Sequence, residues 1–235
     1  QRRPAEALAF WGLRPGMSIL EVAPGGQPWW TEILAPYAAR TGGHFAATGA
    51  DLHSPATTAA QLQARRAFEL RYADTARYGR VSVVDWGADA APLPANSYDW
   101  VLISREFHNF MLRGLTQKFL RDIHASLRPG GIVAIEQHRG NPGPQDPLAN
   151  SGYVTEAFVI EAMAHAGFTL AGRSDINANP RDTKDHPFGV WTLPPTRSSV
   201  AAGSGKPADP AFDHSRYDAI GESDRMTLRF VKSGN

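Results

Sequence analysis

A carboxylate followed by a glycine-rich turn is the first feature of this sequence that could do chemistry. Glu21 closes a short apolar run, and Gly25 and Gly26 follow it. Two glycines let the backbone turn tightly and leave room for a ligand to approach it. Pro28 then opens a helical pattern whose first amide groups would face the same place. Because an acid there would repel a pyrophosphate, the turn favours a ligand with a cationic amine.

An acid-x-His pattern occurs twice further along the chain, as Glu106-x-His108 and Glu136-x-His138. Residues i and i+2 of a strand point the same way, so each acid and its histidine would share a face. A neutral histidine can take a proton from a hydroxyl or an amine. We therefore predict His108 and His138 as catalytic residues. The alternative is a divalent metal site built from the two histidines and the two carboxylates.

Strand and helix patterns alternate through the first three quarters of the chain and would position these residues. Apolar runs predict five strands, and longer periodic segments predict helices between them. The strands are predicted at residues 18–23, 44–48, 81–86, 98–104 and 132–137, and the main helices at 29–40, 57–72, 114–127 and 155–166. Such alternation predicts a parallel sheet covered on both faces, with ligands bound beyond the carboxyl ends of the strands.

The last quarter of the chain follows a different pattern. Residues 177–224 are rich in Pro, Gly, Ser and Asp and have weak periodicity, which is typical of a functional lid, a partner contact or disorder. Residues 226–231 are strand-like with no helix after them, so we expect an edge strand that pairs antiparallel beside the last parallel one. We predict one domain over 1–235, with its core in 4–175 plus a last strand at 226–232. Residues 176–225 would be an elaboration over the strand ends.

Composition excludes several classes of function. The 235 residues include 24 Lys and Arg against 23 Asp and Glu, so a net charge of +1 gives no electrostatic case for nucleic acid or a membrane surface. The absence of cysteine excludes disulfides, a cysteine zinc site and a cysteine nucleophile. No apolar run approaches the ~18 residues of a spanning helix. We expect a small-molecule partner, no nucleic acid or membrane partner, and leave a homodimer open.

The order of these motifs resembles that of the class I S-adenosylmethionine-dependent methyltransferases. Residues 21–27 (EVAPGGQ) stand where that superfamily carries an acid-x-Gly-x-Gly-x-Gly turn. Residues 98–103 resemble its fourth-strand motif, and 127–133 (LRPGGIV) its turn before the fifth strand. The resemblance implies an α/β, Rossmann-like sheet of seven strands, mostly parallel with an antiparallel last strand and helices on both faces. It also implies methyl transfer to a small molecule, with S-adenosylmethionine as the cofactor.

The resemblance also suggests where the cofactor would bind. Glu21 would meet its amine, Asp51 its ribose and Asp89 its adenine. The other cofactor-binding residues expected are Ala23, Gly25, Gly26, Gln27 and Ser104. On the substrate side we expect Tyr153, Asn177, Asn179 and Arg139. In this interpretation the site holds no metal.

More narrowly, the chain is similar to a group of poorly characterised, predicted bacterial methyltransferases. That similarity rests on residues 107–110 (FHNF), 185–191 (DHPFGVW) and 217–225 (YDAIGESDR) and extends nearly end to end. Two positions depart from the superfamily, because Ala23 and Gln27 replace the first and last motif glycines. They motivate an alternative, a binding protein that kept the fold without turnover. Members of the group often carry an export signal, so the compartment stays open: the cytoplasm is favoured for a cofactor-dependent enzyme, and export is the alternative.

Overall fold

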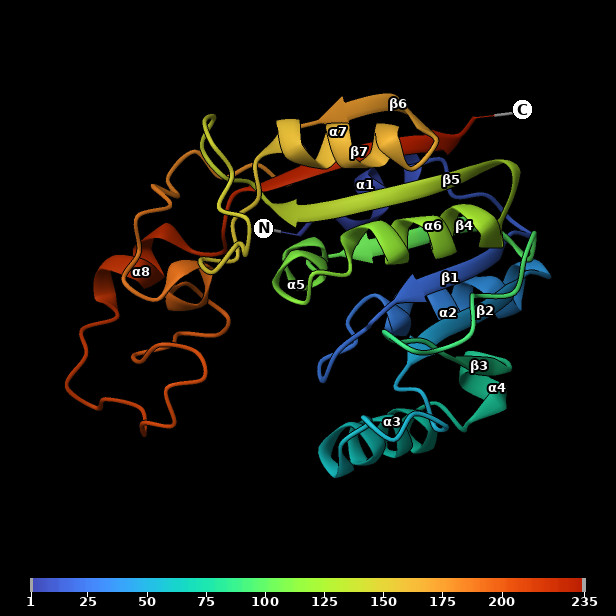
Figure 1. Cartoon of the computed structure of the whole chain (residues 1–235), viewed down its shortest axis with the longest axis horizontal. Coiled ribbons are helices and arrows are strands. Elements are labelled where there is room, and N and C mark those ends of the chain that lie inside the picture. Colours follow the sequence, from blue (N-terminus) through green and yellow to red (C-terminus); the bar gives the residue numbers. More distant parts are fainter. Residues whose placement is uncertain (1, 234–235) are drawn as a thin grey trace.

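The computed structural model describes residues 2–233, which contain a seven-stranded sheet in the order β3-β2-β1-β4-β5-β7-β6 (Figure 1). Strands β1 to β5 run parallel, and β7 runs antiparallel to both of its neighbours. The strands are β1 (Ser18–Val22), β2 (His44–Gly49), β3 (Val81–Asp85), β4 (Tyr98–Ser104), β5 (Leu127–His138), β6 (Phe168–Ser174) and β7 (Arg225–Lys232). This arrangement confirms the predicted fold class.

The position expected for the last strand was wrong in one respect. β7 is not an edge strand, because it lies between β5 and β6 and pairs with both. Met226, Thr227 and Leu228 are successive and all buried, so both faces of β7 are covered as well as both of its edges. The edge of the sheet on this side is β6.

Helices cover both faces of the sheet (Figure 1). On one face, α1 and α2 pack in a cluster with Trp11, Leu34 and Trp100. On the other face, α5, α6 and α7 contribute Phe110, Ile123 and other residues to a second cluster. The helices are α1 (Pro4–Phe10), α2 (Thr31–Thr41), α3 (Ala59–Arg71), α4 (Thr75–Tyr78), α5 (Phe107–Leu112), α6 (Thr116–Ser126), α7 (Glu156–His165) and α8 (Ser215–Ile220), with a 3₁₀ turn η1 (Gly189–Thr192). None of those within residues 2–233 combines the length and apolar character that crossing a membrane requires.

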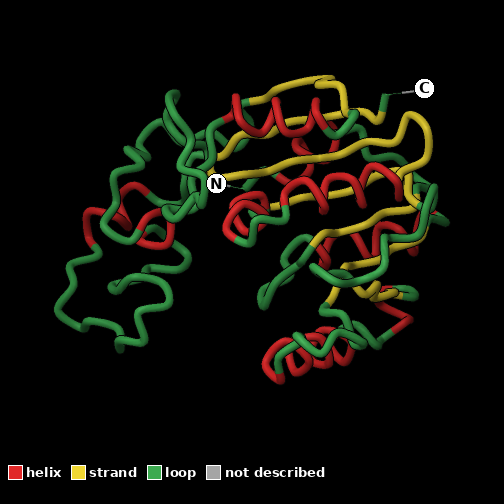
Figure 2. The backbone as a smooth tube through the Cα atoms, in the orientation of Figure 1, coloured by secondary structure: helices red, strands yellow, loops and turns green. Residues whose placement is uncertain are grey.

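The segment between β6 and β7 forms a loop-rich lobe on the side of the sheet where β1, β4 and β5 end (Figure 2). Asn177 Nδ2 donates to Thr227 Oγ1 over 3.1 Å and so ties the start of the lobe to β7. Asn179 Nδ2 donates to the backbone oxygens of Ile220 and Glu222, which joins the two ends of the lobe. The lobe is therefore held against the end of the sheet where a ligand is expected.

Candidate active site

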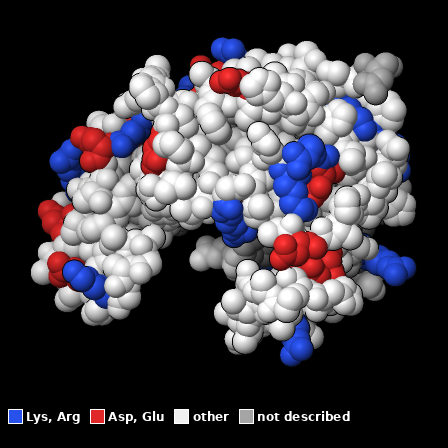
Figure 3. All heavy atoms as spheres, viewed as in Figure 1, with Lys and Arg blue, Asp and Glu red and all other residues white. Residues whose placement is uncertain are grey.

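A cleft of about 820 Å³ opens at the carboxyl ends of the central strands. Its walls come from the turn after β1, the residues after β4, the end of β5 and the C-terminal lobe, which contributes Val190, Trp191 and Ser223. The molecular surface is visibly hollowed between that lobe and the part that carries α3 (Figure 3). A volume of this size is within the range of small-molecule sites.

The glycine-rich turn borders the cleft, and its backbone explains the residue types. Ala23 takes a left-handed conformation with φ of 44°, and its backbone N–H donates to Thr48 Oγ1 over 2.8 Å. Gly25 is also left-handed, with φ of 69°. A Cβ added at Gly25 or Gly26 would meet nothing within 4 Å, so these two glycines face open space. Ala23 thus keeps the turn that a glycine would form, at a cost in strain.

Replacing Ala23 by glycine should therefore stabilise the protein. An L-residue in the left-handed region costs about 1 kcal/mol or more, which glycine avoids. We expect Ala23→Gly to raise the free energy of unfolding by about 1 kcal/mol and the Tm by about 2–4 °C. Ala67→Gly, the same change on the exposed face of α3, should destabilise by about 1 kcal/mol. Denaturant unfolding of both variants measures this, and equal effects at the two positions would contradict it.

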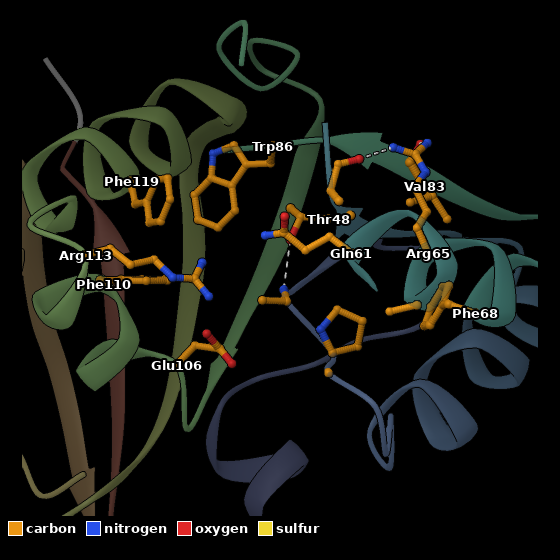
Figure 4. Close-up of a pocket in the computed structure, with 16 residues that line it drawn as sticks. Thr48, Gln61, Arg65, Phe68, Val83, Trp86, Glu106, Phe110, Arg113 and Phe119 are labelled. Carbon is orange, nitrogen blue, oxygen red and sulfur yellow. Dashed lines mark hydrogen bonds between the residues drawn. The ribbon is translucent and has the colours of Figure 1, made fainter. Parts of the chain in front are cut away.

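A second, aromatic cavity of about 220 Å³ adjoins the cleft (Figure 4). The two spaces share four lining residues, which are Ala23, Pro24, Gly25 and Glu106. Trp86, Phe110 and Phe119 form one wall of the aromatic cavity, and Phe68 and Gln61 of α3 lie opposite them (Figure 4). The Trp86 and Phe119 ring centroids are 3.9 Å apart. Such walls suit a flat, apolar ring.

A guanidinium and a carboxyl group lie next to each other after β4, beside the junction of the two spaces. Arg105 lines the cleft in a left-handed conformation, with φ of 57°, and its guanidinium has no hydrogen-bond or ion-pair partner within residues 2–233. Glu106 lines both spaces and accepts a hydrogen bond from Asn109 Nδ2 over 3.0 Å. Burial raises the pKa of Glu106 to about 7. A cation next to a carboxyl group that ionises near pH 7 matches the two charges of a zwitterionic ligand.

His108 and His138 come together in the same cleft, as predicted, but His108 lies in α5 and not on a strand, because β4 already ends at Ser104. Their ring centroids are 5.8 Å apart. Burial lowers the pKa of His108 to about 4 and that of His138 well below the usual value, and the charges of Arg105 and Arg225 add to the effect on His138. Both rings are therefore neutral at pH 7, the state in which a histidine can accept or donate a hydrogen bond.

A buried ionic network lies next to the histidines, around Glu136 of β5. Glu136 accepts hydrogen bonds from Ser104 Oγ at 2.8 Å, Trp30 Nε1 at 3.1 Å and the Arg225 guanidinium at 2.8 Å. Burial works to raise the pKa of Glu136, but the nearby charges of Arg225 and Arg105 hold it below its usual value. Arg225 also pairs with Glu222, which in turn binds Arg2 near the N-terminus.

This network is at odds with the hypothesis of a metal-dependent enzyme. Both oxygens of Glu136 already have hydrogen-bond donors, so this side chain is not available as a ligand beside His138. Across residues 2–233, no group of three or more His, Asp or Glu side chains converges in a way that could hold a metal ion.

The predicted cofactor residues fall into two groups. Ala23, Gly25, Gly26, Gln27 and Ser104 line the cleft. The three predicted acids do not line either space: Glu21 is buried and accepts from Thr31 Oγ1 over 2.6 Å, Asp51 accepts from the backbone of His53, and Asp89 is exposed. Burial also raises the pKa of Glu21 to about 7. For these three acids, a role in cofactor binding stays a prediction.

The predicted substrate residues do not line the cleft either. Tyr153 donates its hydroxyl to buried Asp182, over 3.0 Å to each carboxylate oxygen. Arg139 donates to Asp175 and to the backbone of Arg225. With Asn177 and Asn179, these side chains hold the C-terminal lobe on the sheet. For these four residues, contact with substrate stays a prediction.

Several residues of the site were missed, or were predicted in another role. Glu106 had been considered only as a metal ligand, and Arg105 was not among the predicted site residues. The usable signal for both was a charged pair that directly follows the fourth apolar strand and precedes His108. Ser223 and Arg225 carried none, since they reach His138 and Glu136 from more than 80 positions away. Trp191 lies 5.8 Å from His108 between ring centroids and also comes from the distant lobe.

Comparison with known proteins points to a methyltransferase fold, which agrees with a ligand site at the carboxyl ends of the strands. Residues 25–135 match a family model described as a methyltransferase domain. No curated protein matches the chain. Among solved structures, a S-adenosylmethionine-dependent methyltransferase from Methanosarcina mazei is 12% identical, with a TM-score of 0.59 and full coverage of both chains.

Two further structures show how varied proteins with this fold are. A Burkholderia thailandensis 1,6-didemethyltoxoflavin N1-methyltransferase with bound S-adenosylhomocysteine is 16% identical, with a TM-score of 0.51 over 99% of this chain and 78% of that one. The [4+2]-cyclase SpnF is also 16% identical, with a TM-score of 0.56 over 98% and 80% of the two chains. At these identities the likeness shows the fold, and the reaction must be argued from the site.

Proposed function

We propose that this chain transfers a methyl group from S-adenosylmethionine to a small molecule. The chain has the fold of the class I S-adenosylmethionine-dependent methyltransferases and matches a methyltransferase domain over residues 25–135. One observation supports this proposal more strongly than the others. An aromatic cavity and a polar cleft share the glycine-rich turn, and Arg105 and Glu106, which form no ion pair within residues 2–233, lie beside their junction. That pattern matches a ligand with an aromatic base at one end and a zwitterionic amino acid at the other.

The residues present fit such a cofactor. The aromatic cavity with Trp86, Phe110 and Phe68 would take the adenine ring. Arg105 would bind the carboxylate of the methionyl group, and Glu106 its ammonium. Gly25 and Gly26 leave open space along the turn between the two. When bound, the cofactor supplies a methyl group on a sulfonium, which transfers to a nucleophile without a metal or a redox step.

The chain's own residues would then act on the acceptor. Methyl transfer depends most on proximity and alignment, and a base is needed only where the nucleophile carries a proton. Two neutral histidines, His108 and His138, lie in the same cleft as the turn. Val190 and Trp191 of the C-terminal lobe border this part of the cleft and would exclude water from it.

The alternative is a binding protein without turnover. Such a protein would bind the cofactor at the same site but would methylate no acceptor. Ala23 and Gln27 motivated it, yet Ala23 keeps the left-handed turn and Gln27 lines the cleft without filling it. SpnF, a [4+2]-cyclase, illustrates that this fold also hosts other chemistry. Cofactor binding with no methylated product from any tested acceptor would favour this alternative.

Calorimetric titration of S-adenosylmethionine and S-adenosylhomocysteine into the protein tests the cofactor site. We expect Glu106→Gln to weaken binding about 10- to 100-fold, because an ammonium loses a charged partner. The pKa of about 7 for Glu106 determines how the affinity for the ligand changes with pH. The carboxylate is ionised above that pH, so affinity should rise from pH 6 to pH 8 in the wild type and stay flat in the variant.

Glu161→Gln, on the exposed face of α7, is the matched control and should bind like the wild type. Unchanged affinity in Glu106→Gln would remove this carboxylate from the site. Absence of binding by the wild type at millimolar ligand would overturn the proposed function itself.

A further inference from the structure

The geometry points to Gln137 as a positioning residue that fixes His108 as a hydrogen-bond donor and leaves His138 to take the acceptor's proton. This inference rests on the proposed function and specifies its acceptor, which would be a hydroxyl group. Gln137 was not singled out by the sequence, because it alternates with Glu136 and His138 along β5 and faces away from them.

The side chain of Gln137 is fully buried, and backbone groups set its orientation. Its Oε1 accepts from the backbone N–H of Phe107 over 3.2 Å, and its Nε2 donates to the carbonyl of Gly152 over 3.0 Å. Exchanging the two ends of the amide would place two donors face to face at Phe107 and two acceptors face to face at Gly152. Two buried hydrogen bonds would be lost, so only one orientation is stable.

The second hydrogen of Nε2 then points at His108, whose Nδ1 is 3.2 Å away. A donor on Gln137 requires a lone pair on Nδ1. The neutral ring must therefore carry its proton on Nε2. His108 lines the cleft, and within residues 2–233 its Nε2 has no protein partner. His108 thus offers an N–H to the acceptor and has no free lone pair with which to take a proton.

His138 is held differently. Its Nδ1 lies 2.6 Å from the hydroxyl oxygen of Ser223, which can either donate or accept. When Ser223 accepts from Nδ1–H, the lone pair of His138 is on Nε2. That arrangement leaves His138 as the ring of the pair that can receive a proton, and Ser223 as the group that supports it once it has.

A donor next to a proton acceptor is suited to a hydroxyl. An oxygen has two lone pairs, so one can accept the N–H of His108 while the other forms the bond to the methyl carbon. The carbon–sulfur bond breaks with its electron pair left on sulfur, and the hydroxyl proton moves to Nε2 of His138. A neutral amine has a single lone pair, and a hydrogen bond from His108 would occupy the electrons needed for attack.

Nitrogen-15 NMR of the histidine rings tests the inference without any acceptor. We expect His108 in the wild type to show a protonated Nε2 and an unprotonated Nδ1 at pH 7. In Gln137→Glu an oxygen faces Nδ1 in place of an N–H, so we expect the proton on Nδ1. Gln145→Glu, an equivalent change in the loop after β5, should leave the His108 signals unchanged. A wild-type His108 protonated on Nδ1 would overturn the inference.

Matched pairs of acceptors complete the test, each pair carrying a hydroxyl or an amine on the same ring. Methylation at the hydroxyl supports the inference, and methylation at the amine overturns the hydroxyl assignment. The ring protonation is measured without transfer, so a failure of the proposed function and a failure of this inference give different results.

Discussion

Arg225→Met should destabilise the protein by about 3–5 kcal/mol, the usual cost of leaving a buried charge without its partner. The substitution removes the guanidinium that pairs with Glu136 and Glu222. The Arg225 and Glu136 side chains are each 4% exposed, so water cannot take over the role of the lost partner. For a chain of this length, we expect a fall in Tm of about 6–20 °C.

Two further variants separate the lost charge from lost packing. Arg128→Met breaks an ion pair with Asp99 at the surface and should cost less than about 1 kcal/mol. Adding Glu136→Gln to Arg225→Met removes the uncompensated carboxylate and should recover part of the loss. Denaturant unfolding measures all three. If Arg225→Met lowered the free energy of unfolding no more than Arg128→Met does, the ionic network of Glu136, Arg225 and Glu222 would not stabilise the site.

His138→Ala should lower the rate of methyl transfer to a hydroxyl acceptor by about 10²- to 10⁴-fold, the range for removing a positioned base. Its ring lies 5.8 Å from that of His108, and it lines the cleft without lining the aromatic cavity proposed for adenine. Arg105 and Glu106, not His138, are the proposed partners of the methionyl group. The dissociation constant of S-adenosylhomocysteine should therefore stay within about twofold of the wild-type value, well under the 1.4 kcal/mol of a tenfold change. A fall in kcat at constant cofactor affinity is the signature of a group that acts on the acceptor.

His44→Ala is the control for this change. His44 is exposed at the start of β2, at the opposite end of the sheet from the cleft, and its loss should leave the rate unaltered. Single-turnover kinetics with radiolabelled cofactor separates the chemical step from product release. A His138→Ala variant with wild-type single-turnover rate would show that His138 takes no proton during transfer.

The sequence was a good guide to the parts of the site made by local segments. Apolar strands that alternate with helices predicted the parallel sheet, and a ligand site follows at the carboxyl ends of such strands. Gly25 and Gly26 marked the turn, and the acid-x-His pattern marked the two strand ends that meet in the cleft. Each of these signals lies within a few residues of the feature that it predicts.

The remaining parts depend on contacts between distant segments, which leave no local pattern. Arg225 meets Glu136 only because β7 inserts between β5 and β6, and the sequence suggested an edge strand there. Tyr153 had the residue type of a substrate contact, but a buried partner, Asp182, is provided by the lobe. Glu21 shows the same limit, since its position at a strand end did not reveal that Thr31 would bind its carboxylate.

A crystal structure of the protein with S-adenosylhomocysteine would show directly whether the two spaces form the cofactor site. We expect the adenine ring in the aromatic cavity beside Trp86 and Phe68, with the homocysteine carboxylate at Arg105 and its ammonium at Glu106. His108 and His138 should remain free to face the acceptor side of the cleft. A ligand bound elsewhere, or a structure in which both spaces stay empty at saturating ligand, would show that the two spaces are not the cofactor site.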